Sequence, residues 1–357
     1  MKTSRIGRKS FLKVVLSSIL PLWSGGAFAQ RTEQRSVLIG VFEGAGTEPD
    51  VAVRIITQEL NRTGSFVATI QNLQAPILLR AKSISESNPD GALIFLSNDQ
   101  IICMLPLVVK PTFGIDPNRE VVPIAGFGTY VDAFAISADV SPKSFSEYID
   151  WAKNGGASSR IGLTEGLGGK PDRLELVRPG AGSVREIGPK YPATTHGLLI
   201  RIVSAHYGIP YKGVEYAPNK TQDMYKDLKS GALPACVDRQ SRLLAGHKDG
   251  SHRILATTGA VRQQTSPDVP TFAELGLSGV EQPRFHGFYG PRGLPKAIVA
   301  QFEEGVRRAL GRPDVRDGLR QASIAPRFMS SDELSGLATS FRTEWEKVIS
   351  LVGFAPD

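Results

Sequence analysis

The chain has few of the residues that hold a fold together through covalent bonds or metal ions. Its 357 residues include two cysteines and five histidines. Two cysteines exclude a disulfide-dense scaffold and a four-cysteine zinc site. Cys103 and Cys236 each lie in an apolar stretch, so we expect them to be buried apart, with a bridge between them as the alternative. His247 and His252 are five residues apart in a glycine-containing stretch, a spacing that does not suit a metal site, and we expect no metal.

A long apolar run is also missing. A helix needs about 20 apolar residues to cross a bilayer, and the apolar run over residues 14–23 is much shorter. It follows five basic residues without an acid and precedes small residues at Ala27 and Ala29. This order is typical of a secretory signal peptide, cleaved after Ala29, with an uncleaved membrane anchor as the alternative. Residues 7–13 resemble a twin-arginine export box in which Lys9 replaces the second arginine, which leaves both export routes open.

The basic charge of the chain is concentrated in this leader. The formal net charge is +7, and removal of the five basic residues of the leader lowers it to +2. A nearly balanced chain gives no support to nucleic acid or a membrane surface as a partner. The arginines at 308, 312, 316 and 320 recur at a helical spacing, but Gly311 and Pro313 interrupt them and acids lie between them. We therefore interpret them as a solvated face.

Short apolar, β-rich segments alternate with helical ones along the chain. We expect strands over residues 35–42, 66–70, 91–96, 130–137, 159–163, 213–216, 232–237 and 253–257. We expect helices over residues 49–60, 76–85, 144–154, 196–207, 221–228, 296–310 and 331–351, with capping boxes that begin at Ser144 and Ser330. Residues 166–192, rich in glycine, proline and charge, predict a long loop or insertion. The alternation predicts an α/β fold with parallel sheets and helices on both faces.

Three common enzyme motifs are incomplete or absent in this sequence. After Gly44 and Gly46, the later glycine of a dinucleotide loop is replaced by Pro49. Lys170 is followed by Pro171, where a phosphate loop has the Ser or Thr that holds magnesium. The G-x-S-x-G motif of a hydrolase is absent from the sequence. We therefore expect binding without catalysis, and no cofactor.

Turns at the ends of the predicted strands are the candidate binding sites. A turn from a strand into a helix directs N–H groups and the positive end of the helix dipole at one place, which suits a carboxylate or phosphate. In open α/β sheets, ligands bind beyond the carboxyl ends of the strands. An ordinary helix cap is the alternative at each turn. The candidate residues are Glu43, Gly44, Ala45, Gly46, Thr47, Ser97, Asn98, Thr164, Glu165, Gly166, Thr194, Thr195, His196, Pro218 and Asn219.

Several motifs resemble those of one family. Residues 266–276 contain Pro-Asp-Val-Pro-Thr followed by Glu and Gly, residues 288–299 contain Gly-Pro-Arg-Gly-Leu-Pro and end in Ile-Val, residues 313–316 are Pro-Asp-Val-Arg, and residues 88–91 are Asn-Pro-Asp-Gly. From about Val37 to the C-terminus, apart from residues 166–192, the chain resembles the substrate-binding proteins of tripartite tricarboxylate transporters, the Bug family. The resemblance implies a type II periplasmic-binding fold with two lobes, each a mainly parallel sheet flanked by helices. One lobe would comprise residues 31–132 and 255–357, and the other residues 133–254.

The resemblance also implies which residues bind the ligand. The family's first ligand loop, which holds a carboxylate partly through water, falls on Phe42, Glu43, Gly44, Ala45, Gly46 and Asp50. Its second loop falls on Thr164-Glu165-Gly166 and Thr194-Thr195-His196, separated here by the insertion. Asp238 matches an aspartate at the end of a family strand, where it would bind a hydroxyl or ammonium group or serve as a structural cap. Glu43 would repel an anion by roughly 1 kcal/mol at 4 Å in water, which argues against a simple di- or tricarboxylate.

The function implied by the resemblance is that of a monomeric extracytoplasmic receptor. It would capture a small organic acid, amide or zwitterion by lobe closure and deliver it to a two-component membrane transporter. Two alternatives stay open at this stage: a ligand sensor for a membrane signalling kinase, and an exported enzyme on a binding-protein fold.

We predict that the exported protein begins at Gln30, because Ala27 and Ala29 form the cleavage pattern. The intact mass of the protein released from the periplasm should match residues 30–357. Recovery of the full-length chain from the membrane fraction would support the uncleaved anchor instead.

Overall fold

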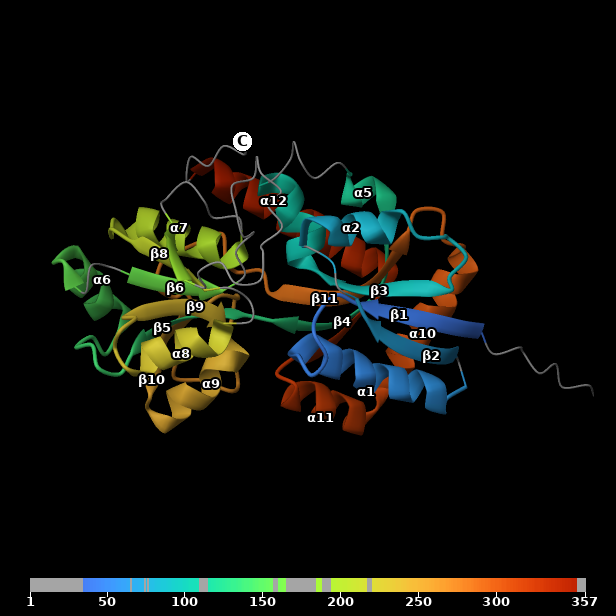
Figure 1. Ribbon diagram of the computed structural model, residues 1–357, viewed down its shortest axis with the longest axis horizontal. Helices are drawn as coiled ribbons and strands as arrows, with labels where there is room; N and C mark the ends of the chain where they lie inside the picture. The colour runs from blue at the N-terminus through green and yellow to red at the C-terminus, as the bar shows by residue number, and fades with distance from the viewer. Residues whose placement is uncertain are drawn as a thin grey trace, which may run out of the picture. The chain divides into compact units, whose positions relative to one another are not determined.

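The structure is a computed structural model that describes residues 35–64, 66–73, 75, 77–108, 115–156, 160–164, 184–187, 194–216 and 220–351. All of them fall within one compact unit of the chain, residues 34–357. Two six-stranded sheets, each flanked by helices, form this unit (Figure 1). The predicted α/β class is therefore confirmed.

The first sheet combines strands from the two ends of the described chain. Its order is β12-β4-β11-β3-β1-β2. The strands are β1 (Arg35–Val41), β2 (Phe66–Asn72), β3 (Leu93–Asn98), β4 (Val121–Tyr130), β11 (Arg284–Pro291) and β12 (Ala325–Met329). β1 is parallel to β2 and β3, whereas β11 is antiparallel to both β3 and β4.

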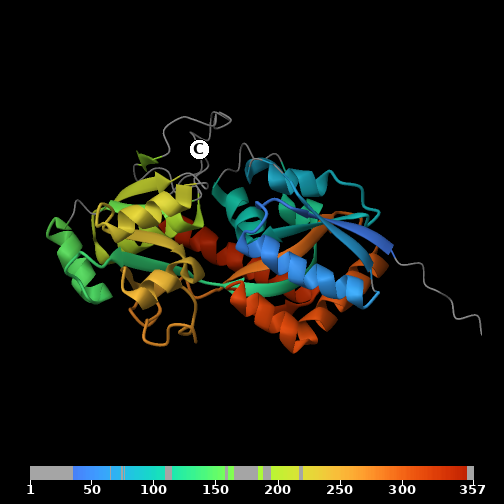
Figure 2. The ribbon, with the colours of Figure 1, turned by 60° about the horizontal axis from the view of Figure 1, so that its bottom comes forward.

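Two groups of helices cover this sheet. Apolar residues of α1 (Glu48–Arg62), α10 (Lys296–Gly311) and α11 (Pro313–Gln321) form one core cluster with the sheet. In both ribbon views α1 and α11 lie side by side (Figures 1 and 2). The other cluster includes residues of α2 (Ile77–Ser85), the π-helix η1 (Gln100–Met104), α3 (Leu105–Val108) and α12 (Ser331–Leu351). A short helix, α5 (Pro117–Glu120), precedes β4.

The second sheet is built from the middle of the chain. Its order is β10-β5-β9-β6-β8-β7. The strands are β5 (Asp132–Ser137), β6 (Arg160–Thr164), β7 (Val184–Ile187), β8 (Lys212–Tyr216), β9 (Ala235–Arg239) and β10 (His252–Thr257). Its helices are α6 (Phe145–Lys153), α7 (Thr195–Tyr207), α8 (Thr221–Lys229) and α9 (Gln240–Asp249).

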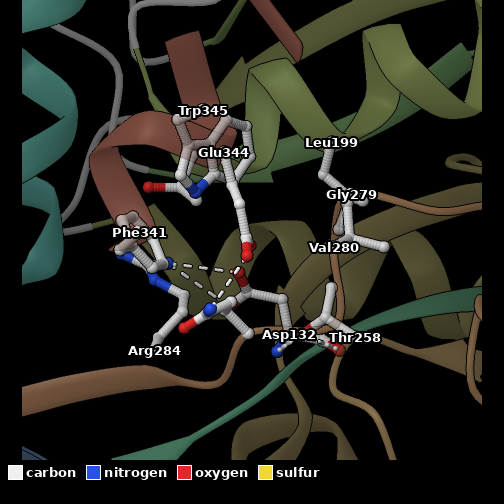
Figure 3. Close-up of a pocket in the computed structure, with 11 residues that line it drawn as sticks. Asp132, Leu199, Thr258, Gly279, Val280, Arg284, Phe341, Glu344 and Trp345 are labelled. Carbon is white, nitrogen blue, oxygen red and sulfur yellow. Dashed lines mark hydrogen bonds and ion pairs between the residues drawn. The ribbon is translucent and has the colours of Figure 1, made fainter. Parts of the chain in front are cut away.

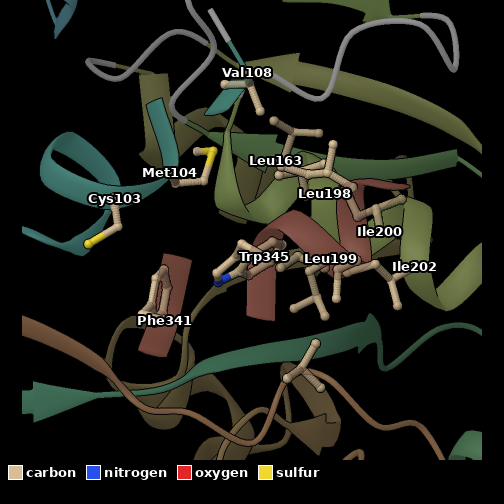
Figure 4. Packing of buried hydrophobic residues seen from close by; sticks show 14 of the residues in the cluster. Cys103, Met104, Val108, Leu163, Leu198, Leu199, Ile200, Ile202, Phe341 and Trp345 are labelled. Carbon is tan, nitrogen blue, oxygen red and sulfur yellow. The ribbon is translucent and has the colours of Figure 1, made fainter. Parts of the chain in front are cut away.

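One apolar cluster continues from the first sheet to the second. Figure 4 shows Met104 of η1 and Trp345 of α12 in the same cluster as Leu198 and Leu199 of α7. The chain itself crosses between the sheets at Val131, which separates β4 from β5. Packing and connectivity therefore both join the two sheets.

The sheets are more antiparallel than the sequence predicts. β6 is parallel to β8 and β9, but β5 is antiparallel to β9 and β10. The chain leaves the first sheet through β4 and re-enters it through β11, so these neighbouring strands run in opposite directions. The expected mainly parallel sheets are mixed sheets instead, and the predicted insertion contains a strand, β7, paired with β8.

Strand β11 is fully buried, although its sequence does not predict a strand. It contains two glycines, a histidine and an arginine in eight residues. At Gly287, an added Cβ would lie 2.6 Å from Leu334 and 3.2 Å from the carbonyl oxygen of Ala125. Glycine is therefore required where α12 and β4 approach this strand most closely.

Several local predictions are confirmed. Ser330 Oγ accepts from Glu333 N, and Glu333 accepts from Ser330 N, as a capping box requires. In the other predicted box, Ser144 accepts from Glu147 N, but the Glu147 carboxylate accepts from Lys143 N. The arginines expected to form a solvated face lie on α10, at the junction of α10 and α11, and on α11, and Arg308, Arg312 and Arg320 pair with neighbouring acids.

The burial of the cysteines and the length and polarity of the helices also agree with the sequence predictions. Cys103 and Cys236 are buried and unbridged, as predicted. In the described part of the chain, every helix is too short or too polar to cross a membrane.

We predict that Phe302→Ala lowers the free energy of unfolding by about 3–5 kcal/mol. Phe302 is buried, with its ring centroid 5.3 Å from that of Phe66 and 5.1 Å from that of Phe288. Denaturant unfolding would measure the loss, with Val261→Ala, at a 72% exposed position, as a control that should change stability little. A loss below 1 kcal/mol would contradict a tightly packed core at Phe302.

Candidate functional site

The loop between β1 and α1 is the first predicted binding loop, and its tip is exposed. Gly44, Ala45 and Gly46 are exposed, whereas Phe42 is buried. Thr47 N and Thr47 Oγ1 both donate to the Gly44 carbonyl, at 3.2 and 2.7 Å. Gly46 has a φ of 81°, a conformation that favours glycine. The loop is therefore a defined turn at the start of a helix.

Asp50 stabilises this loop through hydrogen bonds of its buried side chain. Its side chain is buried and accepts from Gly46 N at 2.8 Å, from Arg54 Nε at 2.8 Å and from Asn72 Nδ2 at 2.8 Å. Burial alone would raise the pKa of Asp50, but the hydrogen bonds from Arg54, Asn72 and Gly46 outweigh it and lower this pKa. These contacts give Asp50 a structural role in the loop.

Glu43 is already paired, which corrects the electrostatic expectation. Its Oε1 lies 3.0 Å from Arg80 NH1, and both side chains are 21% exposed. The Arg80 guanidinium also lies 5.7 Å from the ring centroid of Phe42, which stacks on Phe95. Because Arg80 compensates the charge of Glu43, the repulsion expected from an isolated carboxylate does not apply.

The end of β3 supplies a buried polar run. Ser97, Asn98, Asp99 and Gln100 are all buried. Asn98 Oδ1 accepts from Ile101 N and so caps η1, while Ser97 Oγ has no hydrogen-bond partner among the described residues. The sequence predicted Ser97 and Asn98 as site residues but missed Asp99.

The start of α7 is a helix cap combined with a buried histidine–aspartate contact. Thr194 Oγ1 accepts from Gly197 N at 3.0 Å. His196 Nε2 lies 3.1 Å from Asp132 Oδ1, and both residues are buried. Thr195 is buried beside them. The backbone of Thr164 ends β6, whereas Glu165, Gly166, Pro218 and Asn219 lie outside the described residues.

The carboxylate of Asp238 accepts hydrogen bonds from three protein groups. Its oxygens accept from Tyr225 OH at 2.7 Å, from Arg242 NH1 at 3.2 Å and from Arg239 N at 2.7 Å. The residue is completely buried. This geometry favours the structural cap among the two roles that the sequence left open.

A chain of buried charges, which the sequence did not reveal, joins the two sheets. Arg284 Nε donates to Asp99 Oδ2 at 2.9 Å, and Arg284 NH1 donates to Asp132 Oδ2 at 3.2 Å. Asp99 also accepts from Tyr130 OH and from Phe285 N, both at 3.2 Å. Asp99 follows β3, Asp132 begins β5 and Arg284 begins β11.

Asp99 and Asp132, the two partners of Arg284, have pKa values shifted in opposite directions. Burial raises the pKa of Asp99, even though Arg284 opposes it. Burial would also raise the pKa of Asp132, but Arg284 and His196 outweigh it and hold this pKa far below its usual range. Asp132 is therefore held ionised, with the Arg284 guanidinium and the His196 ring as its partners.

A second unpredicted pair lies beside the first loop. Glu48, the first residue of α1, has Oε2 3.4 Å from Arg239 NH1 and 3.4 Å from Ser241 Oγ. The guanidinium of Arg239 lies 4.3 Å from the ring centroid of Tyr130. Arg239 ends β9, so this pair brings the first binding loop to the end of a strand in the second sheet.

His286 is buried against the same tyrosine. Its ring lies 4.7 Å from that of Tyr130 and 5.8 Å from that of Phe127, both stacked. Neither ring nitrogen has a hydrogen-bond partner among the described residues. Burial, together with Arg239 and Arg284, holds the pKa of His286 well below its usual value.

The cavity next to Arg284 is too small for an organic ligand. Figure 3 shows Asp132 and Arg284 on one side of it and Trp345 on the other. Its volume is about 10 Å³, which is roughly the space that one water molecule needs. The described residues also contain no cluster of histidine, cysteine, aspartate and glutamate that would hold a metal ion. The strand-end loops therefore stay the predicted place for a ligand.

Comparison with known proteins gives a consistent result. The sequence model of the family described as "Tripartite tricarboxylate transporter family receptor" matches residues 51–354. A UPF0065 protein of Cupriavidus necator is 22% identical over 330 residues, which cover 92% of this chain and 91% of that protein.

Solved structures share the fold. A protein of R. palustris, solved with adipate, is 21% identical with a TM-score of 0.73, and the match covers 91% of this chain and 100% of that one. MatC of Rhodopseudomonas palustris, solved with bound malate, is 20% identical with a TM-score of 0.69, covering 88% and 99%.

We predict that His286 makes the protein sensitive to mild acid. Its pKa is lower in the folded chain than the 6.5 of an exposed histidine, so the unfolded chain binds the additional proton. Stability is then fully present above pH 6.5 and falls below it by roughly 1.4 kcal/mol per pH unit. Between pH 7.5 and 5.5, denaturant unfolding should show a smaller loss for His286→Phe than for the wild type. Equal losses would contradict the prediction.

Proposed function

Because the chain belongs to the tripartite tricarboxylate transporter receptor family, as its motifs predicted, we propose that it is an extracytoplasmic receptor for a small organic acid or a related polar metabolite. One observation carries the proposal beyond family membership: polar groups at the strand ends of both sheets meet where Glu48 contacts Arg239. Such a place between two α/β units is where ligands bind in folds of this kind.

The two sheets correspond, in this proposal, to two lobes that close on the ligand. The first lobe contains β1–β4, β11 and β12, and the second contains β5–β10. Because β10 extends to Thr257, the changeover lies a few residues beyond the one the sequence suggested. The turn at Gly44, Ala45 and Gly46 is the exposed surface that meets the carboxylate.

The ligand class is supported by chemistry and by relatives. The turn before α1 lies at the positive end of a 15-residue helix, which favours an anion. The malate-bound and adipate-bound relatives share the fold. The remaining predicted residues whose side chains the structure describes, Ser97, Asn98, Thr194 and Thr195, line the rest of this site in the proposal.

The cellular setting completes the proposal. The leader at residues 1–29 directs export to the periplasm. There the protein acts as a monomer that passes its ligand to a two-component membrane transporter and carries out no covalent chemistry. The sensor and exported-enzyme alternatives receive no support from the family, whose description is that of a transporter receptor.

We predict that binding depends on the turn at Gly46. Gly46 and Gly276 both have positive φ, and an added Cβ at either position meets nothing within 4 Å, so valine introduces similar backbone strain at both. In a thermal-shift and calorimetric screen of organic acids and amino acids, a ligand at 100 times its Kd should add about 2.7 kcal/mol to the stability of the wild type. Gly46→Val should weaken that binding at least ten-fold, whereas Gly276→Val should retain it.

Native mass spectrometry of freshly purified protein supplies an independent measurement, because it detects a ligand that co-purifies. Absence of any bound acid in both experiments would refute the receptor. Equal weakening by the two valine variants would refute the assignment of the turn.

A further inference from the structure

We propose that Glu48 and Arg239 form a two-charge recognition pair that selects a carboxylate ligand bearing an N–H donor, an ammonium or amide group, over a simple dicarboxylate. The inference rests on the proposed function, because the pair borders the same ligand site. It names the ligand class more narrowly than the family does.

Glu48 is a buried carboxylate with one unused oxygen. Its side chain is 9% exposed. Oε2 contacts Arg239 and Ser241, whereas Oε1 is buried without a hydrogen-bond partner among the described residues. A buried acceptor that is left unpaired costs about 1–3 kcal/mol, so such a group in a native protein needs an explanation, such as a missing partner. A ligand N–H group would supply the missing donor.

The contacts of Glu48 are long for a charged pair. Both are 3.4 Å, whereas strong hydrogen bonds between charged groups are about 2.7–2.9 Å. Burial raises the pKa of Glu48 although Arg239 and Arg242 oppose it, so the arginines do not fully compensate the burial of this carboxylate. The pair is therefore suited to exchange these contacts for better ones with a ligand.

Arg239 is positioned independently of Glu48. Its side chain is 4% exposed, and its guanidinium lies 4.3 Å from the ring centroid of Tyr130. The Tyr130 hydroxyl in turn donates to Asp99 at 3.2 Å. A guanidinium held against a fixed ring binds a carboxylate without much loss of side-chain entropy, and its planar fork matches the two carboxylate oxygens.

The two charges together determine the ligand. A carboxylate on Arg239 places the group on the adjacent carbon of the ligand near Glu48, because Glu48 Oε2 lies 3.4 Å from Arg239 NH1. A hydrogen there would leave Glu48 Oε1 without a donor, whereas an ammonium or amide group would be attracted. The acid that the sequence suggested for discrimination, Glu43, pairs with Arg80 at 3.0 Å, a closer contact than the 3.4 Å between Glu48 and Arg239, so the discrimination belongs to Glu48.

Succinate, malate and aspartate test the proposal, because they share a four-carbon skeleton and differ at C2 in having hydrogen, hydroxyl or ammonium. Adipate and 2-aminoadipate form a matching pair of longer length. Calorimetry on the exported protein at neutral pH should show that the ammonium-bearing member of each series binds at least ten-fold more tightly than the plain dicarboxylate.

Glu48→Gln should reverse this preference. The variant keeps the shape of the side chain but removes its charge, so the affinity for the amino acid should fall at least ten-fold and that for the dicarboxylate should stay equal or rise. Glu59→Gln is the matched control, because Glu59 is a buried carboxylate of the same helix that pairs with Arg62 near its other end. It should leave the preference of the wild type unchanged.

The possible outcomes distinguish a failure of this inference from a failure of the proposed receptor function. Wild-type protein that binds dicarboxylates as tightly as amino acids, or a Glu48→Gln variant that weakens both equally, would overturn the inference and leave the receptor in place. Binding of none of the organic acids or amino acids would overturn both. A thermal unfolding curve of each variant shows whether the protein is folded under the conditions of the measurement.

Discussion

The buried guanidinium of Arg284 is the interaction on which the rest of the structure depends. It lies between Asp99, which follows β3 of the first sheet, and Asp132, which begins β5 of the second. Removing one partner from a buried ion pair costs about 3–5 kcal/mol, because the other charge then remains buried and unpaired. Arg284 and its two aspartates therefore fix how the ends of β3, β5 and β11 meet. The contact between His196 and Asp132 links this group to the start of α7.

The candidate site is assembled on this support. Asp99 accepts a hydrogen bond from the Tyr130 hydroxyl, and the guanidinium of Arg239 packs against the ring of Tyr130. Arg239 reaches Glu48 at the start of α1, beside the exposed turn that Asp50 fixes from within. Each step is a contact between buried groups, so the charges at the site are positioned by the core and not by surface loops. A receptor needs this arrangement, because a ligand is selected by charges that are already in place.

Local signals in the sequence identified elements well where caps and periodicity agree. Ser330 and Glu333 form their capping box, and Thr194 caps α7. β11 was missed because its glycines, arginine and histidine hide a strand that is wholly buried. The mixed direction of the sheets was missed for a different reason: strand direction follows from where the chain crosses between sheets, and periodicity carries no information about that crossing.

The sequence by itself determined the α/β class, the separate burial of the two cysteines, the family and the turn before α1. Each of these depends on neighbouring residues or on motifs that neighbouring residues form. Only the tertiary structure decided which charges are paired. Glu43 and Arg80 are 37 residues apart, Glu48 and Arg239 are 191 apart, and Asp99 and Arg284 are 185 apart. Charged residues carry no local sign of their partner, because a buried ion pair is defined by the surroundings that exclude water from it, and those surroundings exist only in the folded chain.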